Sequence, residues 1–462
     1  MVLVKKNYKK IFLFLGVLVL LIVGAVFATE NHYQDKFYPN SEFAGVDISN
    51  MSVEDATDSV METINNKQVT VTENDQEIAS IPLGDITNLD SATADLTEYF
   101  STQHEDIMLK DLFSTTIYAF DINEHMNIDS EHTAQVLAEA GISNENRTAT
   151  KDAEIQYVDG EGYSIAEEVY GTQFDEENVA NQLYENQSIN LNDAYIKPNR
   201  TSEDEQLNQA MDKINAIENT SITLNIAGNK ETLPKEAIQS FIIADKNGNI
   251  SIDTPAIEAY LSTYNDRYAT YQKDRTFNST LSGTVSVPGE YSTMGWSIDR
   301  AAEAEQITQD LLASEDVERE PAINGSHYEF GDGYGDSYIE VDLRNQQMFV
   351  YLDGKQALST PIISGHPETT TEAGSYYIWN KDKDSTLNGY NKRTGVTYAT
   401  PVNYWLPIDY VGQGIHDASW QTGFGGETYL TNGSNGCINV DPKVMEEVFN
   451  LSYVGMPVVM FY

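Results

Sequence analysis

The spacing of hydrophobic and polar residues changes along the chain, and each spacing predicts a different kind of element. Residues 11–28 form an uncharged apolar run that is long enough to cross the hydrocarbon core of a membrane. In the middle of the chain, apolar residues recur at helical spacing and are followed by short alternating runs. From about Ser337 alternation dominates, beginning with Ile339, Val341 and Leu343, and this pattern predicts strands.

The N-terminal apolar run predicts a cytoplasmic tip and transmembrane anchor over residues 1–30. Lysines precede the run, so they are expected in the cytoplasm and the rest of the chain outside, as a single-pass membrane protein. A cleaved signal peptide is the alternative, since residues 26–28 offer small residues to a peptidase, but its apolar stretch is usually shorter. The lysines are Lys5, Lys6, Lys9 and Lys10.

An internal similarity organises the middle of the chain. Residues 56–86 and 208–238 can be laid over one another at an offset of about 152 residues, and each begins with a helical stripe and continues as strands. Two copies are too few for a solenoid, so we expect two α+β modules in tandem, over residues 31–198 and 199–325. Residues 276–296 are rich in Ser, Thr and Gly and are expected to form a connector within the second module.

The C-terminal region, residues 337–462, is expected to be a separate β-rich domain with an antiparallel sheet. Asp441-Pro442 is a helix start signal just after its cysteine. The predicted fold class is therefore multidomain: an N-terminal transmembrane helix, two α+β modules in tandem and a C-terminal β-rich domain. Further strands are expected at residues 361–365, 376–379, 402–406 and 458–462.

Composition limits the possible partners and cofactors. The 462 residues are 40% hydrophobic and 10% aromatic, which is enough to build cores. Asp and Glu number 72 against 27 Lys and Arg, and the formal charge of −45 argues against nucleic acid as a partner. A single cysteine excludes an intramolecular disulfide, and the scattered histidines show no zinc-ligand spacing. We therefore expect no metal and no cofactor.

Cys437, the only cysteine, is the leading candidate for a nucleophile. It lies in the run Gly-Ser-Asn-Gly-Cys-Ile-Asn over residues 433–439, twenty-one residues after His416. A thiol attacks an acyl carbon as thiolate, so the site is expected to lower the thiol pKa, with His416 as general base. Gly436 would let amide N–H groups converge on the oxyanion, and Ser434 would orient the imidazole.

Three aromatic residues near this histidine are candidates for the walls of a substrate cleft. Tyr404, Trp405 and Trp420 would exclude water and so favour an amine over water as the second nucleophile. The alternative is that they are core residues, which is the commoner place for aromatic side chains in a β-rich domain.

At these residues the chain resembles the L,D-transpeptidase family, whose YkuD-type catalytic domain carries an early histidine followed by a Ser-His-Gly-Cys segment. Residues 416–420 and 434–439 match it in order and spacing, and the resemblance covers about residues 337–462. The tandem modules more weakly resemble the peptidoglycan-binding domains often placed before this catalytic domain. One departure is Asn435, which stands where the family has its second histidine; an amide cannot shuttle a proton, so Asn435 is expected to tune activity.

The resemblance implies peptidoglycan cross-linking on the cell-wall side of the membrane. The cysteine would attack the diamino acid at position three of a donor tetrapeptide stem, release D-alanine and pass the acyl group to an acceptor stem in a 3-3 cross-link. It also implies acylation by carbapenems. Two alternatives remain open at this point: an L,D-carboxypeptidase that resolves the same thioester with water, and a non-catalytic cell-wall-binding protein in which Asn435 marks a decayed site.

Overall fold

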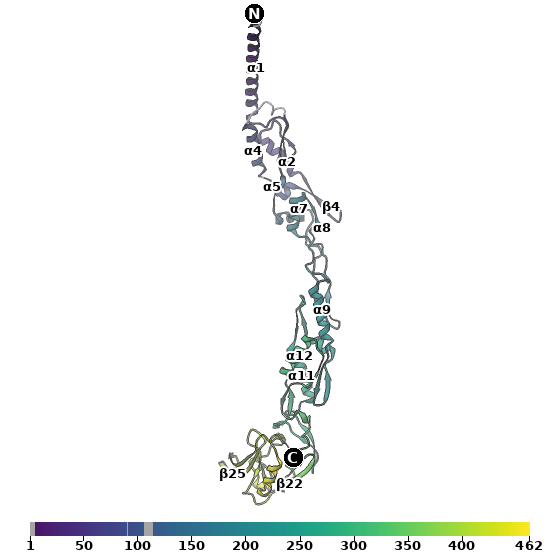
Figure 1. Ribbon diagram of the computed structural model, residues 1–462, viewed down its shortest axis with the longest axis vertical. Coiled ribbons are helices and arrows are strands. Elements are labelled where there is room, and N and C mark those ends of the chain that lie inside the picture. Colours follow the sequence, from purple (N-terminus) through teal and green to yellow (C-terminus); the bar gives the residue numbers. More distant parts are fainter. Residues whose placement is uncertain (1–4, 90, 106–113) are drawn as a thin grey trace. The chain divides into compact units, whose positions relative to one another are not determined.

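The computed structural model describes residues 5–89, 91–105 and 114–462 of the chain (Figure 1). The first four residues of the predicted anchor segment lie outside this description. Two compact units divide the chain, the first formed by residues 1–154 and 165–204 and the second by residues 155–164 and 205–462. The domain boundaries expected above stay predictions.

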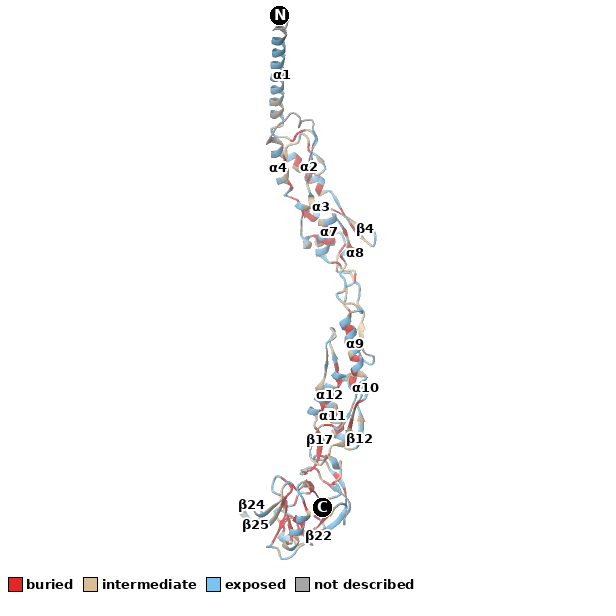
Figure 2. Ribbon diagram, in the orientation of Figure 1, coloured by how far each residue is buried: buried red, intermediate tan, exposed pale blue. Residues whose placement is uncertain are grey.

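The first unit begins with a long helix, α1 (Lys5–His32). Its stretch Tyr8–Thr29 has a mean hydropathy of 3.1, so α1 is long and apolar enough to cross a membrane, a property shared by anchors and signal sequences. The helix is exposed along most of its length (Figure 2).

The rest of the first unit is a mixed α/β module around one apolar core. In its central sheet β3 (Gln68–Glu73) pairs with β4 (Gln76–Pro82) in antiparallel and with β10 (Ser188–Asn190) in parallel orientation. Helices α2 and α7 contribute Val60, Ile64 and Leu183 to this core. Its other elements are β1 (Ser41–Phe43), β2 (Val46–Asp47), α2 (Val53–Asn65), α3 (Leu83–Ile86), β5 (Thr87–Asn88), α4 (Ala92–Glu105), β6 (Thr116–Tyr118), α5 (Ile122–His125), β7 (Asn127–Ile128), α6 (Ser130–Glu139), α7 (Glu176–Asn186) and α8 (Leu191–Ala194).

The second unit starts with a module of the same local topology, which we call the second module (α9 to β19). Helix α9 (Glu205–Glu218) leads into the hairpin of β11 (Ile222–Ile226) and β12 (Asn229–Thr232), and β18 (Val317–Arg319) pairs in parallel with β11. Both modules thus repeat a helix followed by strands, as the internal similarity predicted, and the structure adds a later strand that runs parallel to the first strand of the hairpin. The second module also contains α10 (Lys235–Phe241), β13 (Ile242–Ala244), β14 (Ile250–Ile252), α11 (Thr254–Tyr268), β17 (Trp296–Ile298), α12 (Arg300–Ala313) and β19 (Ile323–Gly325), and β8 (Glu154–Val158) and β9 (Gly162–Ala166) lie at the division between the units.

The predicted connector at residues 276–296 was wrong in part, because much of it is a hairpin. Strands β15 (Arg275–Ser279) and β16 (Gly283–Val287) pair along five positions. Phe277 and Val287 of this hairpin bury their side chains against Phe461 at the end of the chain. In β16, Val285 and Val287 alternate with Thr284 and Ser286. The high content of Ser and Thr led to the prediction of a connector instead of strands.

A nine-stranded sheet forms the C-terminal domain, in the order β23-β28-β20-β21-β22-β27-β26-β25-β24. It is mixed, so the antiparallel expectation was wrong for two pairs: β20 runs parallel to β28, and β26 runs parallel to β27. The elements are β20 (Tyr338–Asp342), β21 (Gln347–Leu352), β22 (Lys355–Ile363), β23 (Gly374–Tyr377), β24 (Asp382–Asn391), β25 (Val396–Pro407), β26 (Gly414–Asp417), α13 (Tyr429–Asn432), β27 (Ile438–Val440), α14 (Pro442–Leu451) and β28 (Pro457–Phe461).

Helix α14 covers one face of this sheet with Met445, Val448 and Phe449. Asp441 caps its N-terminus by accepting a hydrogen bond from the backbone of Lys443. The parallel pair β26–β27 matters most for function. It places His416 opposite Asn439, two residues beyond Cys437.

Candidate active site

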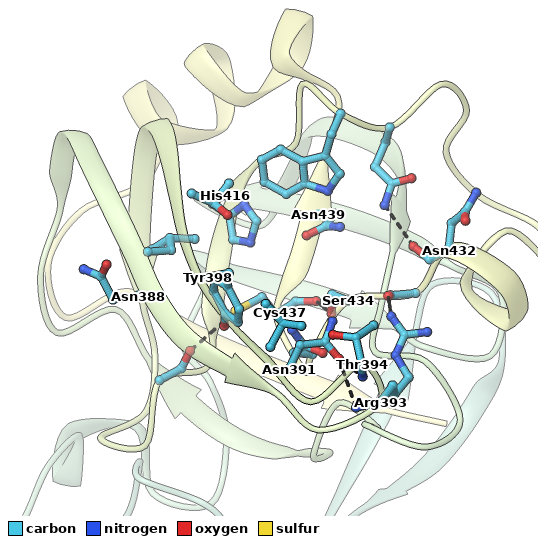
Figure 3. Close-up of a pocket in the computed structure, with 18 of the residues that line it drawn as sticks. Asn388, Asn391, Arg393, Thr394, Tyr398, His416, Asn432, Ser434, Cys437 and Asn439 are labelled. Atoms are coloured by element: carbon cyan, nitrogen blue, oxygen red, sulfur yellow. Dashed lines mark hydrogen bonds between the residues drawn. The ribbon is translucent and has the colours of Figure 1, made fainter.

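Cys437 and His416 line one open cleft of about 840 Å³ (Figure 3). The cleft lies between the β24–β25 hairpin, the loop before β26 and the turn at residues 433–437. Its lining includes Trp405, Trp420 and Asn439. The structure therefore brings together the two residues on which the sequence interpretation depended most.

His416 is held in one orientation by the backbone. Its side chain is 3% exposed, and Nδ1 lies 2.9 Å from the carbonyl oxygen of Asp417. A carbonyl only accepts hydrogen bonds, so Nδ1 carries the proton and Nε2 is the basic nitrogen. Burial lowers the pKa of His416, while the Asp417 carbonyl and charge oppose that shift. The resting imidazole is therefore neutral.

Asp417 fixes the position of strand β26, which carries His416. Its carboxylate accepts hydrogen bonds from the backbone of Asn403 and Tyr404, both at 2.8 Å, and from the side-chain amide of Asn403 at 2.9 Å. These bonds fix β26 against β25 beneath the cleft. Because the Asp417 carbonyl holds the imidazole, the carboxylate acts on His416 through the backbone.

Cys437 stays a thiol at rest. Burial raises its pKa to about 11; the Gly414 N–H opposes the rise and the charge of Asp409 adds to it. The sulfur lies 3.4 Å from the carbonyl oxygen of Gly412, to which the thiol donates. The expected lowering of the thiol pKa was wrong for the resting site. Desolvation raises the pKa by more than the hydrogen bond from the Gly414 N–H lowers it.

The turn that carries the thiol is locked by short hydrogen bonds. Ser434 Oγ donates to the Cys437 carbonyl at 2.6 Å and accepts from the Gly436 N–H at 3.0 Å. Gly436 has φ +121°, a conformation that favours glycine. Thr371 Oγ1 donates to the Gly436 carbonyl at 2.8 Å. In this arrangement the hydroxyl of Ser434 organises the nucleophile turn, and the imidazole is held by Asp417.

The segment at His366 also supports the turn. Its backbone N–H donates to the Ser434 carbonyl at 3.1 Å, and its ring Nδ1 accepts from the backbone of Glu368. A Cβ added at Gly433 would lie 2.4 Å from the His366 nitrogen, so this approach requires glycine.

The aromatic candidates fall on both faces of the sheet. Trp405 and Trp420 line the cleft, and the centroid of each indole lies 5.8 Å from that of His416. Tyr404 faces the other way and packs on Phe449, with a centroid distance of 5.0 Å. Period-two alternation along β25 explains this split.

Sequence reasoning missed two residues of the cleft, Tyr398 and Arg393. Burial raises the pKa of the Tyr398 phenol, the charge of Cys437 adds to the rise, and a hydrogen bond with Asn435 opposes it. Asn435 itself is exposed at the cleft. The signal available in the sequence was the pair Lys392-Arg393 in an otherwise acidic chain.

The arrangement as a whole has the chemical groups that acyl transfer requires. A lone thiol, a buried neutral imidazole with one free basic nitrogen, and a glycine-framed turn are the parts that a cysteine acyltransferase needs. Among the described residues, no group of three or more His, Cys, Asp or Glu side chains could hold a metal ion.

Comparisons with known proteins agree with this class. A model of the L,D-transpeptidase catalytic domain, YkuD, matches residues 336–460, and a peptidoglycan-binding domain model matches residues 201–318. The structure of the Ldtfm–avibactam carbamoyl enzyme is 41% identical, with a TM-score of 0.50, over 55% of this chain and 99% of that one. The chain therefore belongs to the L,D-transpeptidase family.

Two further solved structures are similar to it. A crystal structure of an Enterococcus faecium L,D-transpeptidase with cysteine changed to serine is 40% identical, with a TM-score of 0.49, over 55% of this chain and all of that one. An NMR structure of the E. faecium catalytic domain acylated by ertapenem is 55% identical, with a TM-score of 0.26, over 27% of this chain and 97% of that one. No curated protein matches the sequence.

Proposed function

We propose that this protein is a peptidoglycan L,D-transpeptidase that forms 3-3 cross-links through a thioester on Cys437. One observation carries the proposal: the thiol opens into a cleft beside a buried, neutral His416 whose Nδ1 is fixed by the Asp417 carbonyl. That tautomer leaves Nε2 to accept a proton from the thiol.

In the acylation step, Cys437 Sγ bonds to the carbonyl carbon of the diamino acid at position three of the donor stem. The thiol proton passes to His416 Nε2 as the bond forms, so no ion pair has to exist beforehand. When the tetrahedral intermediate collapses, the bond to D-alanine breaks and the amine leaves with that proton. The product is a thioester and free D-alanine.

In the second step, an amine of an acceptor stem attacks the thioester. His416 takes the proton of the amine, the new amide forms, and the thiol of Cys437 leaves and is reprotonated. Trp405 and Trp420 flank the imidazole and limit the access of water, which would favour the amine over hydrolysis.

The other site residues are assigned supporting roles. Ser434 positions the turn through its bond to the Cys437 carbonyl, and Gly436 gives the backbone the positive φ that the turn needs. We keep the oxyanion role expected for Gly436 as a proposal for the transition state, because its N–H donates to Ser434 Oγ in the resting site. Asn435, with Tyr398, would tune access to the thiol.

The remaining parts of the chain would place this cleft at its substrate. Helix α1 would anchor the protein in the membrane, with the body on the cell-wall side. The two modules would bind peptidoglycan, as the domain model matched by the second one suggests.

The test is product analysis with disaccharide tetrapeptides as donor and acceptor. The expected products are a 3-3 linked dimer and D-alanine in equal amounts, absent with Cys437→Ala. A tripeptide as the main product would instead identify an L,D-carboxypeptidase. Binding to peptidoglycan without either product, by folded protein, would leave the wall-binding alternative.

A further inference from the structure

The charge of the cleft is opposite to that of the protein. The chain carries a formal charge of −45. In the part of the chain that the structure describes, the lining of the cleft contains one permanently charged cation, Arg393, and no carboxylate. Most other lining groups are amides and hydroxyls, such as those of Asn388, Asn391 and Thr394 (Figure 3). An anionic ligand would therefore meet little repulsion inside the cleft.

Arg393 occupies an ordered position at the tip of the β24–β25 hairpin. The backbone N–H groups of Arg393 and Thr394 donate to Asn391 Oδ1 at 3.0 and 3.1 Å, which closes the turn. The guanidinium donates through Nη2 to the Gly433 carbonyl at 3.0 Å. This bond ties the cation to the residue that begins the nucleophile turn.

The guanidinium is not satisfied by the protein. Its Nε is buried and has no hydrogen-bond partner, and none of the ion pairs among the described residues includes Arg393. A guanidinium has five N–H donors in a planar fork that matches a carboxylate. The Gly433 carbonyl is the one acceptor that the described residues give this side chain, so N–H groups of the fork remain available to an anionic ligand in the cleft that Arg393 lines.

We propose that Arg393 binds a carboxylate of the donor stem and so selects stems that carry it. The inference rests on the proposed function, which makes a stem peptide the ligand. In Figure 3, Arg393 and His416 lie on opposite sides of Cys437. A stem that crosses the thiol would thus place one end near the general base and a carboxylate near the guanidinium. The carboxylate is either the C-terminal one of D-alanine or the side-chain one of the diamino acid.

The first experiment compares three tetrapeptide donors: unmodified, amidated at the C-terminal carboxylate, and amidated at the side-chain carboxylate of the diamino acid. The wild type is expected to lose about 10- to 100-fold in kcat/KM on the donor that lacks the recognised carboxylate. With Arg393→Gln this discrimination disappears, because the unmodified donor becomes as poor as the amidated one. Lys392→Gln, an exposed cation on the same turn that does not line the cleft, is the matched control and keeps the preference.

Two outcomes would overturn the proposal. Equal rates on all three donors by the wild type would show that no carboxylate is recognised. An equal loss on all three donors with Arg393→Gln, with discrimination intact, would show that Arg393 only clamps the hairpin to Gly433.

The second experiment needs no stem peptide. Cys437 is the only cysteine, so its alkylation rates by iodoacetate and iodoacetamide can be compared in the whole protein at 0.15 M salt. The rate ratio of the anionic to the neutral reagent is expected to fall about 2- to 10-fold in Arg393→Gln and to persist in Arg393→Lys and Lys392→Gln. A fall in the ratio in a protein that does not process stems would uphold the anion site and reject the proposed function. An unchanged ratio would reject the anion site.

Discussion

Arg319 of the second module and Arg393 of the cleft have opposite kinds of hydrogen-bond partner. In the module, Arg319 donates to Glu303 at 2.8 Å and to Asp310 at 2.6 Å, so its charge is matched within the fold. In the cleft, Arg393 has a single backbone carbonyl as its side-chain partner and a buried Nε without one.

The comparison distinguishes charged side chains whose partners lie within the fold, such as Arg319, from the side chain of Arg393, for which we propose a ligand as partner. Glu303 is 1% exposed, and burial raises its pKa, while the Ala322 N–H and Arg319 oppose the rise. A buried carboxylate of this kind destabilises the fold unless hydrogen bonds or an opposite charge compensate for its lost hydration. In the cleft, the buried Asn439 Oδ1 also lacks a partner. The Arg319, Glu303 and Asp310 side chains are therefore paired within the module, while Arg393 and Asn439 each keep a buried polar atom without a partner in the fold.

The strongest test of this contrast is Cys437→Ala. Acyl transfer is expected to fall by at least about 10³-fold, because no other described side chain in the cleft can form the thioester. The unfolding midpoint should change little, since the side chain is small and only half-buried. The measurement is turnover of tetrapeptide donors beside a thermal unfolding curve, and retained turnover would contradict the assigned nucleophile.

The cleft also depends on close backbone packing. Gly433→Ala would place a Cβ 2.4 Å from both the His366 nitrogen and the Tyr429 carbonyl oxygen. The nucleophile turn would have to shift, and we expect a loss of about 10²-fold in kcat/KM. Gly423→Ala is the matched control, because its Cβ would meet nothing within 4 Å. Equal rates for the two variants would show that the turn is not set by this contact.

In the second module, Arg319→Gln should act on stability instead. Removing the cation leaves Glu303 buried beside Asp310, at a cost of about 2–3 kcal/mol in the free energy of unfolding at pH 7.5. The pKa of Glu303 is raised in the folded protein, so folding favours the protonated carboxyl group. The stability that this group contributes is therefore lost as pH rises. The loss caused by the variant should therefore be smaller at pH 5.

Urea unfolding of the wild type and of Arg319→Gln at both pH values measures this effect. Arg393→Gln serves as the control and should unfold like the wild type at either pH, since no described carboxylate pairs with Arg393. A lower free energy of unfolding in Arg393→Gln would show that Arg393, like Arg319, stabilises the fold, and would contradict the proposed difference between them.

The resting protonation state predicts how Cys437 titrates. With a pKa of about 11, the thiolate fraction seen by iodoacetamide should still be rising at pH 9, above the ordinary range of a thiol. Alkylation rates between pH 6 and pH 10 measure it, with free cysteine as the reference. A plateau below pH 8 would indicate a preformed thiolate–imidazolium pair and would contradict the neutral pair.

The smallest effect is expected for Asn435→His. The side chain is exposed and contacts Tyr398, and His416 is the proposed base, so turnover should change by less than about 5-fold. A steady-state comparison with the wild type checks this, and a gain of two orders of magnitude would show that the asparagine impairs the site.

The residues to which we assign the chemistry could be found in the sequence because rare residue types mark them. A single cysteine preceded by Gly433 and Gly436, with a histidine twenty-one residues earlier, predicted the centre of the cleft. The alternation of Ile339, Val341 and Leu343 predicted β20, because one face of that strand is buried in the core.

The walls of the cleft could not be predicted in the same way. Strand β24 is polar and partly exposed along both faces, so it has no apolar alternation, yet its hairpin carries Arg393 and Tyr398. The thiol pKa could not be predicted either, since it depends on desolvation, on the Gly414 N–H and on the charge of Asp409, which only the fold brings near the sulfur.

The most direct test of the central claim is the intact mass of the protein after incubation with an unmodified tetrapeptide donor and no acceptor, quenched in acid. We expect an adduct whose mass equals that of the donor minus D-alanine, located on Cys437 and absent in Cys437→Ala. Folded wild-type protein that shows no adduct and releases no D-alanine would contradict it.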